Sequence, residues 1–318
     1  MIAAVPFRDP WRFQANIEVY LLVVFLIGAY VYAVREIGPK AVAPGEPVIT
    51  RRHFWCFVGA MTILFVASTW PIHQIGEDYL YSAHMFQHMM LSYFMPPLVL
   101  LATPEWLLRV LVGQGRTYKV VAFLSRPVVA GVLFNGMVMV SHIPGVVNTA
   151  TVNGPLHYLV HLVIVLTALL MWMPVVGPFP ELQMKPAGKM IYLFLQGVVP
   201  TVPAAWLAVA EGGVYHHYSH QPVRVWGVSV LDDQQMAGLI MKVGGGVYLW
   251  AIMIYIWFKR FGKQSPTENT YRRTRRPAAD SATPVGASTA PTVEDEQPLT
   301  FDDVAAAFER SDAPAEPH

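Results

Sequence analysis

The chain is 318 residues long, and 54% of the residues are hydrophobic whereas only 14% are charged. A soluble domain carries about a quarter charged residues, so this composition, with a mean hydropathy of +0.40, indicates a membrane protein. The formal net charge of +1 gives no support for a nucleic-acid partner. The single cysteine, Cys56, excludes a disulfide framework within the chain and a paired-thiol metal site.

Apolar runs long enough, or nearly long enough, to cross a bilayer as helices recur along the chain; a crossing takes about 20 residues. In chain order they are Ile17–Val34, Phe54–Trp70, Leu80–Leu101, Val128–Ile143, Leu156–Val176, Met190–Ala210 and Gln235–Phe258. The fourth run is short, and Pro200 and Pro203 predict a kink in the sixth. We therefore predict an all-α, polytopic membrane helix bundle with about seven transmembrane helices.

Lysine and arginine residues are strongly biased toward one side of this arrangement. Seventeen of the 22 lie in the loops after the first, third and fifth runs or just beyond the seventh, whereas three, Arg8, Arg12 and Arg224, lie on the opposite side. Basic residues are enriched in cytoplasmic loops. We therefore expect the N-terminus outside and the C-terminus inside.

The chain divides by composition into two parts. Residues 1–260 contain every apolar run and form the predicted seven-span membrane domain. Residues 261–318 are rich in Pro, Ala, Thr and acidic residues and contain no long apolar run. Such a segment has too little apolar surface to fold, so we predict a disordered cytoplasmic tail.

Histidines gather on one side of the predicted membrane domain. Nine of the eleven fall on the outer side or in the outer third of a span. Two pairs share one spacing, because His84 and His88 open the third span while His157 and His161 open the fifth. Residues four apart lie on one face of a helix. Two such helices side by side could supply four imidazole nitrogens to one metal ion, an arrangement that ordinary packing explains poorly.

Two more histidines complete the candidate metal set. His142 closes the fourth span, and His216 lies in the loop before the seventh, where a solvated loop explains it almost as well as ligation. Imidazole suits zinc, copper, nickel and iron, so the histidines alone do not name the metal. Met85 and Met89 lie one residue off the histidine stripe, and soft thioether ligands of this kind favour Cu(I).

Several other polar residues carry their own expectations. We expect one of Asp232 and Asp233 to cap the seventh helix, and Gln87 or Asp233 to orient a histidine ring. Lys242 lies about 10 Å into the seventh span by helical rise, so it needs a partner from another span. Asn135, in the fourth span, is expected to join two helices by hydrogen bonding.

Three segments give the chain a resemblance to a known family. They are HMFQHMML at 84–91 with PPL at 96–98, HYLVH at 157–161 with WMPV at 172–175, and DQQMAG at 233–238 with Met241. With these segments the sequence resembles the multi-span CtaG family, the caa3-type cytochrome c oxidase assembly factors. The resemblance covers roughly residues 15 to 260.

This resemblance implies a role in assembling a haem-copper oxidase, by helping copper reach it, and no enzymatic activity. Copper is then the expected metal at His84, His88, His157 and His161. Cytochrome c oxidase subunits and copper chaperones are the expected partners, with membrane lipid around the chain and no nucleic acid. The expected location is the plasma (cytoplasmic) membrane of a bacterium, as a multi-pass protein.

Two other classes of protein remain open at this point. A membrane di-iron oxidase or desaturase also uses several histidine boxes, although these normally lie on the cytoplasmic side, opposite to the side expected here. A haem-binding membrane cytochrome needs two axial histidines on facing helices, fewer than the two pairs supply. Metal analysis and a visible absorption spectrum of the purified protein would distinguish the three.

Overall fold

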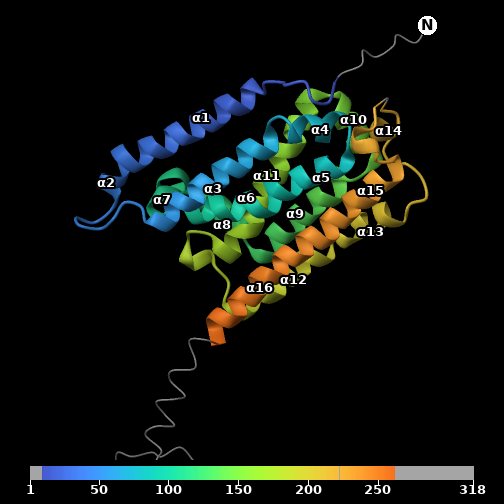
Figure 1. Ribbon diagram of the computed structural model, residues 1–318. Coiled ribbons are helices and arrows are strands. Elements are labelled where there is room, and N and C mark those ends of the chain that lie inside the picture. The colour runs from blue at the N-terminus through green and yellow to red at the C-terminus, as the bar shows by residue number, and fades with distance from the viewer. Residues whose placement is uncertain (1–8, 222, 262–318) are drawn as a thin grey trace, which may run out of the picture. The chain divides into compact units, whose positions relative to one another are not determined.

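The structure, a computed structural model, describes residues 9–221 and 223–261. Every regular element in this part of the chain is a helix. Figure 1 shows the long helices lying side by side as a bundle. The all-α prediction is therefore confirmed.

The first half of the bundle consists of two long helical stretches, a bent one between them and short connecting helices. Its elements are α1 (Ile17–Tyr32), η1 (Ala33–Ile37), α2 (Gly38–Ala41), α3 (Arg51–Ser68), α4 (Ile72–Asp78), α5 (Tyr81–Met89), η2 (Met90–Phe94), α6 (Met95–Ala102) and α7 (Glu105–Val112). The label η here marks a π-helical or 3₁₀ turn. The π-helical η2 continues α5 into α6 directly after the His84/His88 pair, a kind of bulge that is frequent at functional sites.

The second half has the same character. Its elements are α8 (Arg116–Leu124), α9 (Pro127–Ser141), α10 (Pro144–Val152), α11 (Gly154–Val176), η3 (Pro180–Leu182), α12 (Pro186–Val198), α13 (Thr201–Val209), α14 (His216–Ser219), η4 (Val225–Gly227), α15 (Val230–Leu239), η5 (Ile240–Gly244) and α16 (Gly245–Phe261). A turn at Val199 and Pro200 separates α12 from α13 within one helical stretch, Pro186–Val209, at the place where the sequence predicted a kink. Proline cannot donate the backbone hydrogen bond that a continuous helix needs.

Among the described residues, five helical stretches are long and apolar enough to cross a membrane, and two bent pairs raise the number to seven if each pair is one span. The five are Ile17–Ala41, Tyr81–Ala102, Gly154–Val176, Pro186–Val209 and Val230–Arg260. The pairs are Arg51–Ser68 with Ile72–Asp78, bent by 42°, and Arg116–Leu124 with Pro127–Ser141, bent by 70°. All seven predicted runs fall on these helices, so a bundle of about seven spans is confirmed.

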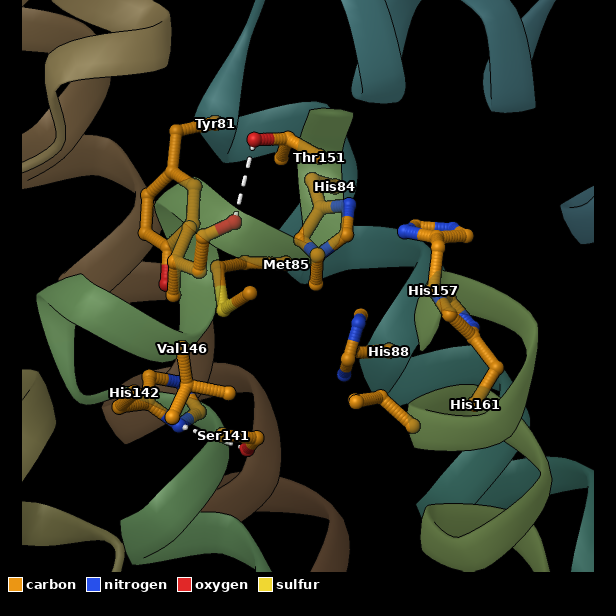
Figure 2. Close-up of a pocket in the computed structure, with 13 residues that line it drawn as sticks. Tyr81, His84, Met85, His88, Ser141, His142, Val146, Thr151, His157 and His161 are labelled. Atoms are coloured by element: carbon orange, nitrogen blue, oxygen red, sulfur yellow. Dashed lines mark hydrogen bonds between the residues drawn. The ribbon is translucent and has the colours of Figure 1, made fainter. Parts of the chain in front are cut away.

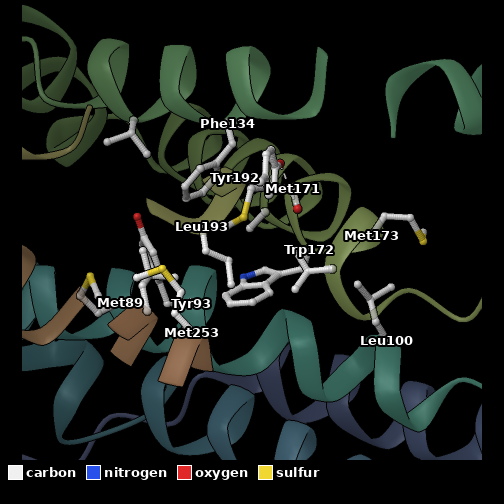
Figure 3. Close-up of a cluster of buried hydrophobic side chains, with 14 residues drawn as sticks. Met89, Tyr93, Leu100, Phe134, Met171, Trp172, Met173, Tyr192, Leu193 and Met253 are labelled. Carbon is white, nitrogen blue, oxygen red and sulfur yellow. Dashed lines mark hydrogen bonds between the residues drawn. The ribbon is translucent and has the colours of Figure 1, made fainter. Parts of the chain in front are cut away.

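The largest core cluster holds the middle of the bundle together. Figure 3 shows Trp172 of α11 among Tyr93 of η2, Leu193 of α12 and Met253 of α16. The Trp172 side chain is fully buried, and its Nε1 donates a hydrogen bond of 3.2 Å to the backbone oxygen of Ser92. Because this indole spans from α11 to the continuation of α5, it helps to set how these two helices lie against each other.

Two polar contacts between spans agree with the sequence expectations. Asn135 of α9 donates from Nδ2 to Oε1 of Gln196 in α12 at 2.7 Å, so it joins two helices as predicted. The Lys242 ammonium donates to the hydroxyl of Thr201 in α13, the expected partner from another span. Such bonds are a recurrent means of joining helices inside membranes.

The tail and the sidedness of the bundle stay predictions. Apart from its first residue, the predicted tail, 261–318, lies outside the described residues. Helix length and composition identify spans but not their direction, so the outside N-terminus and the inside C-terminus depend on the distribution of basic residues alone.

Candidate metal centre

The two histidine-bearing helices begin at the same end of the bundle through different capping contacts. The Asn153 side chain accepts from the backbone N–H of Leu156 and caps α11. Helix α5 is capped from another helix, because the buried Asp233 carboxylate of α15 accepts from the backbone N–H groups of Tyr81 and Ser82 at 2.8 and 2.9 Å. Anions are stabilising at helix N-termini, so Asp233 fixes the start of the helix that carries His84.

The structure brings the two predicted histidine pairs together. Ring centroids lie 4.4 Å apart within His84/His88 and also within His157/His161. Across the helices, His88 lies 4.6 Å and His84 lies 5.8 Å from His161. Figure 2 shows the four rings turned toward one another between α5 and α11. This is the arrangement that the shared spacing predicted.

A carboxylate that the sequence analysis missed lies among these rings. Oε1 of Glu77, in α4, is 3.0 Å from Nδ1 of His84 and 3.2 Å from Nε2 of His157. The same oxygen is 3.9 Å from Nδ1 of His73 and from Nε2 of His161. The sequence held one indication of this role: Glu77 is an acidic residue next to an apolar run, seven positions before His84. Local helical spacing did not reveal it, because α4 and α5 are separate helices.

Gly76 allows Glu77 to approach α5 so closely. A Cβ atom on Gly76 would lie 2.9 Å from the backbone nitrogen of His84 and 3.1 Å from its Cα. Any larger residue would therefore push α4 and α5 apart. A glycine directly before the carboxylate is thus part of the geometry of the cluster.

Two ring nitrogens in the cluster are buried and make no hydrogen bond. They are Nε2 of His88 and Nε2 of His161, whereas the buried Nε2 of His157 lies 3.2 Å from Oε1 of Glu77. His84 donates a hydrogen bond from Nδ1 to Glu77. Histidines that bind a metal through one ring nitrogen usually make such a hydrogen bond with the other. A small cavity of about 20 Å³ lies between these side chains. Unpaired buried polar atoms are costly, and a bound metal ion would satisfy them, so the donor set fits a metal.

The donors form two overlapping groups. One consists of His84, His88 and His161, and the other of Glu77, His157 and His161; within each group the ligand atoms lie within 4.8 Å of one another. Metal–nitrogen and metal–oxygen bonds are about 2 Å long, so small side-chain adjustments would close either group around an ion. Both groups contain His161.

His142 lies beside the cluster and belongs to neither group. It caps the C-terminus of α9, where its Nδ1 donates to the backbone oxygen of Val138 at 2.6 Å. It lines the same small cavity, and its Nε2 is buried without a hydrogen bond. In Figure 2 it lies apart from the four converging rings, next to Ser141.

The structure does not place His216 with the other predicted ligands. Its side chain is exposed at the start of α14, where the ring stacks on His220 with centroids 3.9 Å apart. The short α14 helix directs His216 and His220 away from the cavity that the other five predicted ligands line. The neighbouring His217 contacts the cluster from behind instead, since its Nε2 donates to the backbone oxygen of Glu77 at 2.9 Å.

Of the two residues expected to orient a histidine ring, Gln87 contacts one and Asp233 does not. Gln87 is buried, and its Nε2 donates at 3.1 Å to Nδ1 of His73, a histidine outside the predicted set. Asp233 holds the start of α5 and contacts no histidine directly. The cap of α15 is Ser229, which accepts from the backbone N–H of Asp232, so neither aspartate caps its own helix. Within the predicted histidine pairs, Glu77 is the residue that hydrogen-bonds a ring, that of His84.

Fold and site together define a class: a multi-span helical membrane protein with a histidine and carboxylate cluster at one end of its bundle. The model of one family, described as cytochrome c oxidase caa3 assembly factor (Caa3_CtaG), matches residues 28–262. The chain belongs to this family, as the resemblance in its three motifs suggested. No curated protein and no solved structure matches the chain.

Proposed function

We propose that this protein binds a copper ion at the cluster formed by His84, His88, His157 and His161 and passes it to cytochrome c oxidase during assembly. Membership in a family of oxidase assembly factors supports the assembly role, and we assign no catalytic step to the protein. The partners would be oxidase subunits and copper chaperones. The site would lie at the outer face of a bacterial plasma membrane, where copper arrives.

The single observation that carries the proposal is the convergence of two histidine pairs that leave buried nitrogens unpaired. Nε2 of His88 and Nε2 of His161 have no hydrogen-bond partner. Burying an unpaired polar group costs about 1 to 3 kcal/mol. Two such atoms, in residues that line one small cavity, would destabilise the bundle unless a ligand satisfies them, and imidazole nitrogens suit a transition metal.

Copper is preferred over the other metals that imidazole accepts because of soft donors close by. Met85, Met89 and Met241 line a second cavity of about 30 Å³ that also contacts His88 and His142. Thioether sulfur favours Cu(I) over Zn²⁺. Among the described residues, Glu77 is the only carboxylate in the cluster. One carboxylate is few for the di-iron alternative.

The test is metal retention by the purified full-length protein in detergent. The unsubstituted protein, loaded with copper and washed, should retain copper and show no haem absorption in the visible spectrum. The double variant His84→Ala/His161→Ala should retain less than about a tenth as much, because it removes ligands from both donor groups. Its amount in the membrane fraction should be unchanged.

A second measurement addresses the assembly role. Cells that carry the double variant should have lower cytochrome c oxidase activity than cells with the parent chain, and external copper should restore part of it. Equal copper retention in variant and parent would place the site elsewhere. Retention of iron or haem instead of copper would favour one of the two alternative classes.

A further inference from the structure

The cluster has more donors than one copper ion requires, and they divide unevenly with depth. His84 and His157 lie near the starts of α5 and α11, with Glu77 beside both rings, whereas His88 and His161 lie one turn further along their helices. One turn of helix corresponds to about 5.4 Å of depth. The Glu77, His157 and His161 group is called here the entry position, and the His84, His88 and His161 group the inner position.

We propose that one metal ion occupies these two positions in turn and that His161, which belongs to both, passes the ion between them. This proposal rests on the copper-binding function proposed above. It assigns a ligand role to Glu77. It also assigns the route by which copper would move from the end of the bundle toward the interior.

The shared residue explains why the two positions would be filled in turn. Nε2 of His161 is buried, makes no hydrogen bond and lies 3.9 Å from Oε1 of Glu77, so we assign it to both positions. A ring nitrogen has one lone pair and binds one metal ion at a time. An ion held at one position can therefore move to the other without leaving His161.

Glu77 connects the two positions chemically. Its Oε1 is a donor atom of the entry position and also accepts the Nδ1–H of His84, a ligand of the inner position, at 3.0 Å. Hydrogen bonding of this kind fixes the ring and makes its other nitrogen a better ligand. The carboxylate would thus bind the ion first and afterwards hold His84 in place for the inner position.

The donors become softer along this route. The entry position contains a carboxylate oxygen, the inner position contains imidazoles alone, and the cavity beyond His88 is lined by the side chains of Met85, Met89 and Met241. Oxygen donors suit harder cations, imidazole is intermediate, and thioethers favour Cu(I). The donors therefore favour inward movement of copper in the Cu(I) state, and the transfer between positions involves no change of oxidation state; Cu(II) serves in the experiment as the probe that EPR detects.

The experiment compares single and double substitutions in the full-length protein in detergent, each loaded with a Cu(II) salt and washed. His157→Ala removes a ligand from the entry position, and His88→Ala removes one from the inner position. Two further variants remove a ligand from both positions: the single variant His161→Ala and the double variant His88→Ala/His157→Ala. The double variant replaces His161→Ala in the comparison if the His161→Ala protein does not accumulate in the membrane. His216→Ala is the matched control, because its side chain is exposed and outside the cluster. Metal analysis gives copper per chain, and pulsed EPR counts the coordinated imidazoles.

The parent protein, both single variants and the control should each retain a single copper ion per chain. The His88→Ala variant should show two imidazoles and the His157→Ala variant three, because each holds the ion at its remaining position. The His88→Ala/His157→Ala variant should retain no copper. In His88→Ala a water-soluble chelator should also remove the ion faster than in His157→Ala, since the ion is then nearer the end of the bundle.

Two results would overturn the proposal while leaving the copper-binding function intact. Loss of copper in both single variants would indicate one indivisible site. Two copper ions in the parent protein would indicate independent sites filled together. Absence of copper from the parent protein would instead refute the function proposed above, so the two failures are distinguishable.

Discussion

Two regions of the molecule contain histidines four residues apart, and only one of them forms a cluster. His84/His88 and His157/His161 face each other across α5 and α11, around a carboxylate. His216 and His220 have the same spacing, with His216 opening α14 and His220 directly after its last residue. Their rings stack on each other at 3.9 Å, and both side chains are exposed.

The two regions differ in the groups that surround their histidine rings. In α14, His220 donates from Nδ1 to the backbone oxygen of His216, so the pair satisfies part of its own hydrogen-bonding capacity and water can reach the rest. In α5 and α11, neighbouring helices exclude water and leave ring nitrogens unpaired. Spacing places two imidazoles on one face, but burial against a second pair gives them the arrangement of a candidate metal site.

The largest expected effect separates the two regions directly. His157→Ala/His161→Ala should lower copper retention at least about tenfold, because it removes ligands from both donor groups. The matched variant His216→Ala/His220→Ala should retain as much copper as the parent. Metal analysis of the washed, purified proteins makes the comparison. Equal losses in the two variants would show that burial does not decide which pair binds.

A smaller effect is expected from the carboxylate. Glu77→Gln preserves shape but removes the charge that faces His84 and His157. Removing an orienting partner of a ligand typically lowers metal affinity about 10- to 100-fold. Competition with a chelator of known affinity measures the change. Glu181→Gln, at an exposed carboxylate that pairs with Arg109, is the control and should bind copper as the parent does.

Asp233 tests whether the start of α5 must be held for the cluster to form. Asp233→Asn removes the charge from a buried acceptor of two backbone N–H groups and of the Ser82 hydroxyl. Hydrogen bonds to charged groups contribute about 1.5 to 3 kcal/mol, so the free energy of unfolding should fall by about 2 kcal/mol. Asp232→Asn, at an exposed position, should change it less. Equal melting curves for the two variants in detergent would contradict this role.

The smallest effect is expected at the C-terminus. Deletion of residues 267–318 also removes His318, a further histidine outside the cluster. Because this segment lacks the apolar residues needed to join a core, the shortened protein should insert into the membrane and retain copper like the parent. Loss of the protein from the membrane fraction would show that the segment is structural.

A topology measurement completes the comparison by assigning the cluster to one side of the membrane. A reporter fused after Lys263 should be active in the cytoplasm, as the distribution of basic residues predicts. The helix starts that carry His84 and His157 would then face outside. Activity of a periplasmic reporter at the same site would reverse the sidedness and remove the argument for copper arriving at the cluster from outside.

The sequence alone predicted the apolar runs that became the long helices, the irregularity at Pro200 and the convergence of four histidines. These follow from local physics, because apolar length specifies a crossing and a spacing of four specifies one helix face. It also determined that Lys242 and Asn135 needed partners on other helices, since polar groups in a membrane are rarely left unpaired.

Tertiary structure decided which polar residues meet. Glu77 joins the cluster because Gly76 lets α4 pack tightly against α5, and Asp233 caps a helix that begins about 150 residues earlier in the chain. His216 stays outside because its short helix faces solvent. Contacts between distant segments depend on how whole helices pack, which periodicity along one helix does not specify.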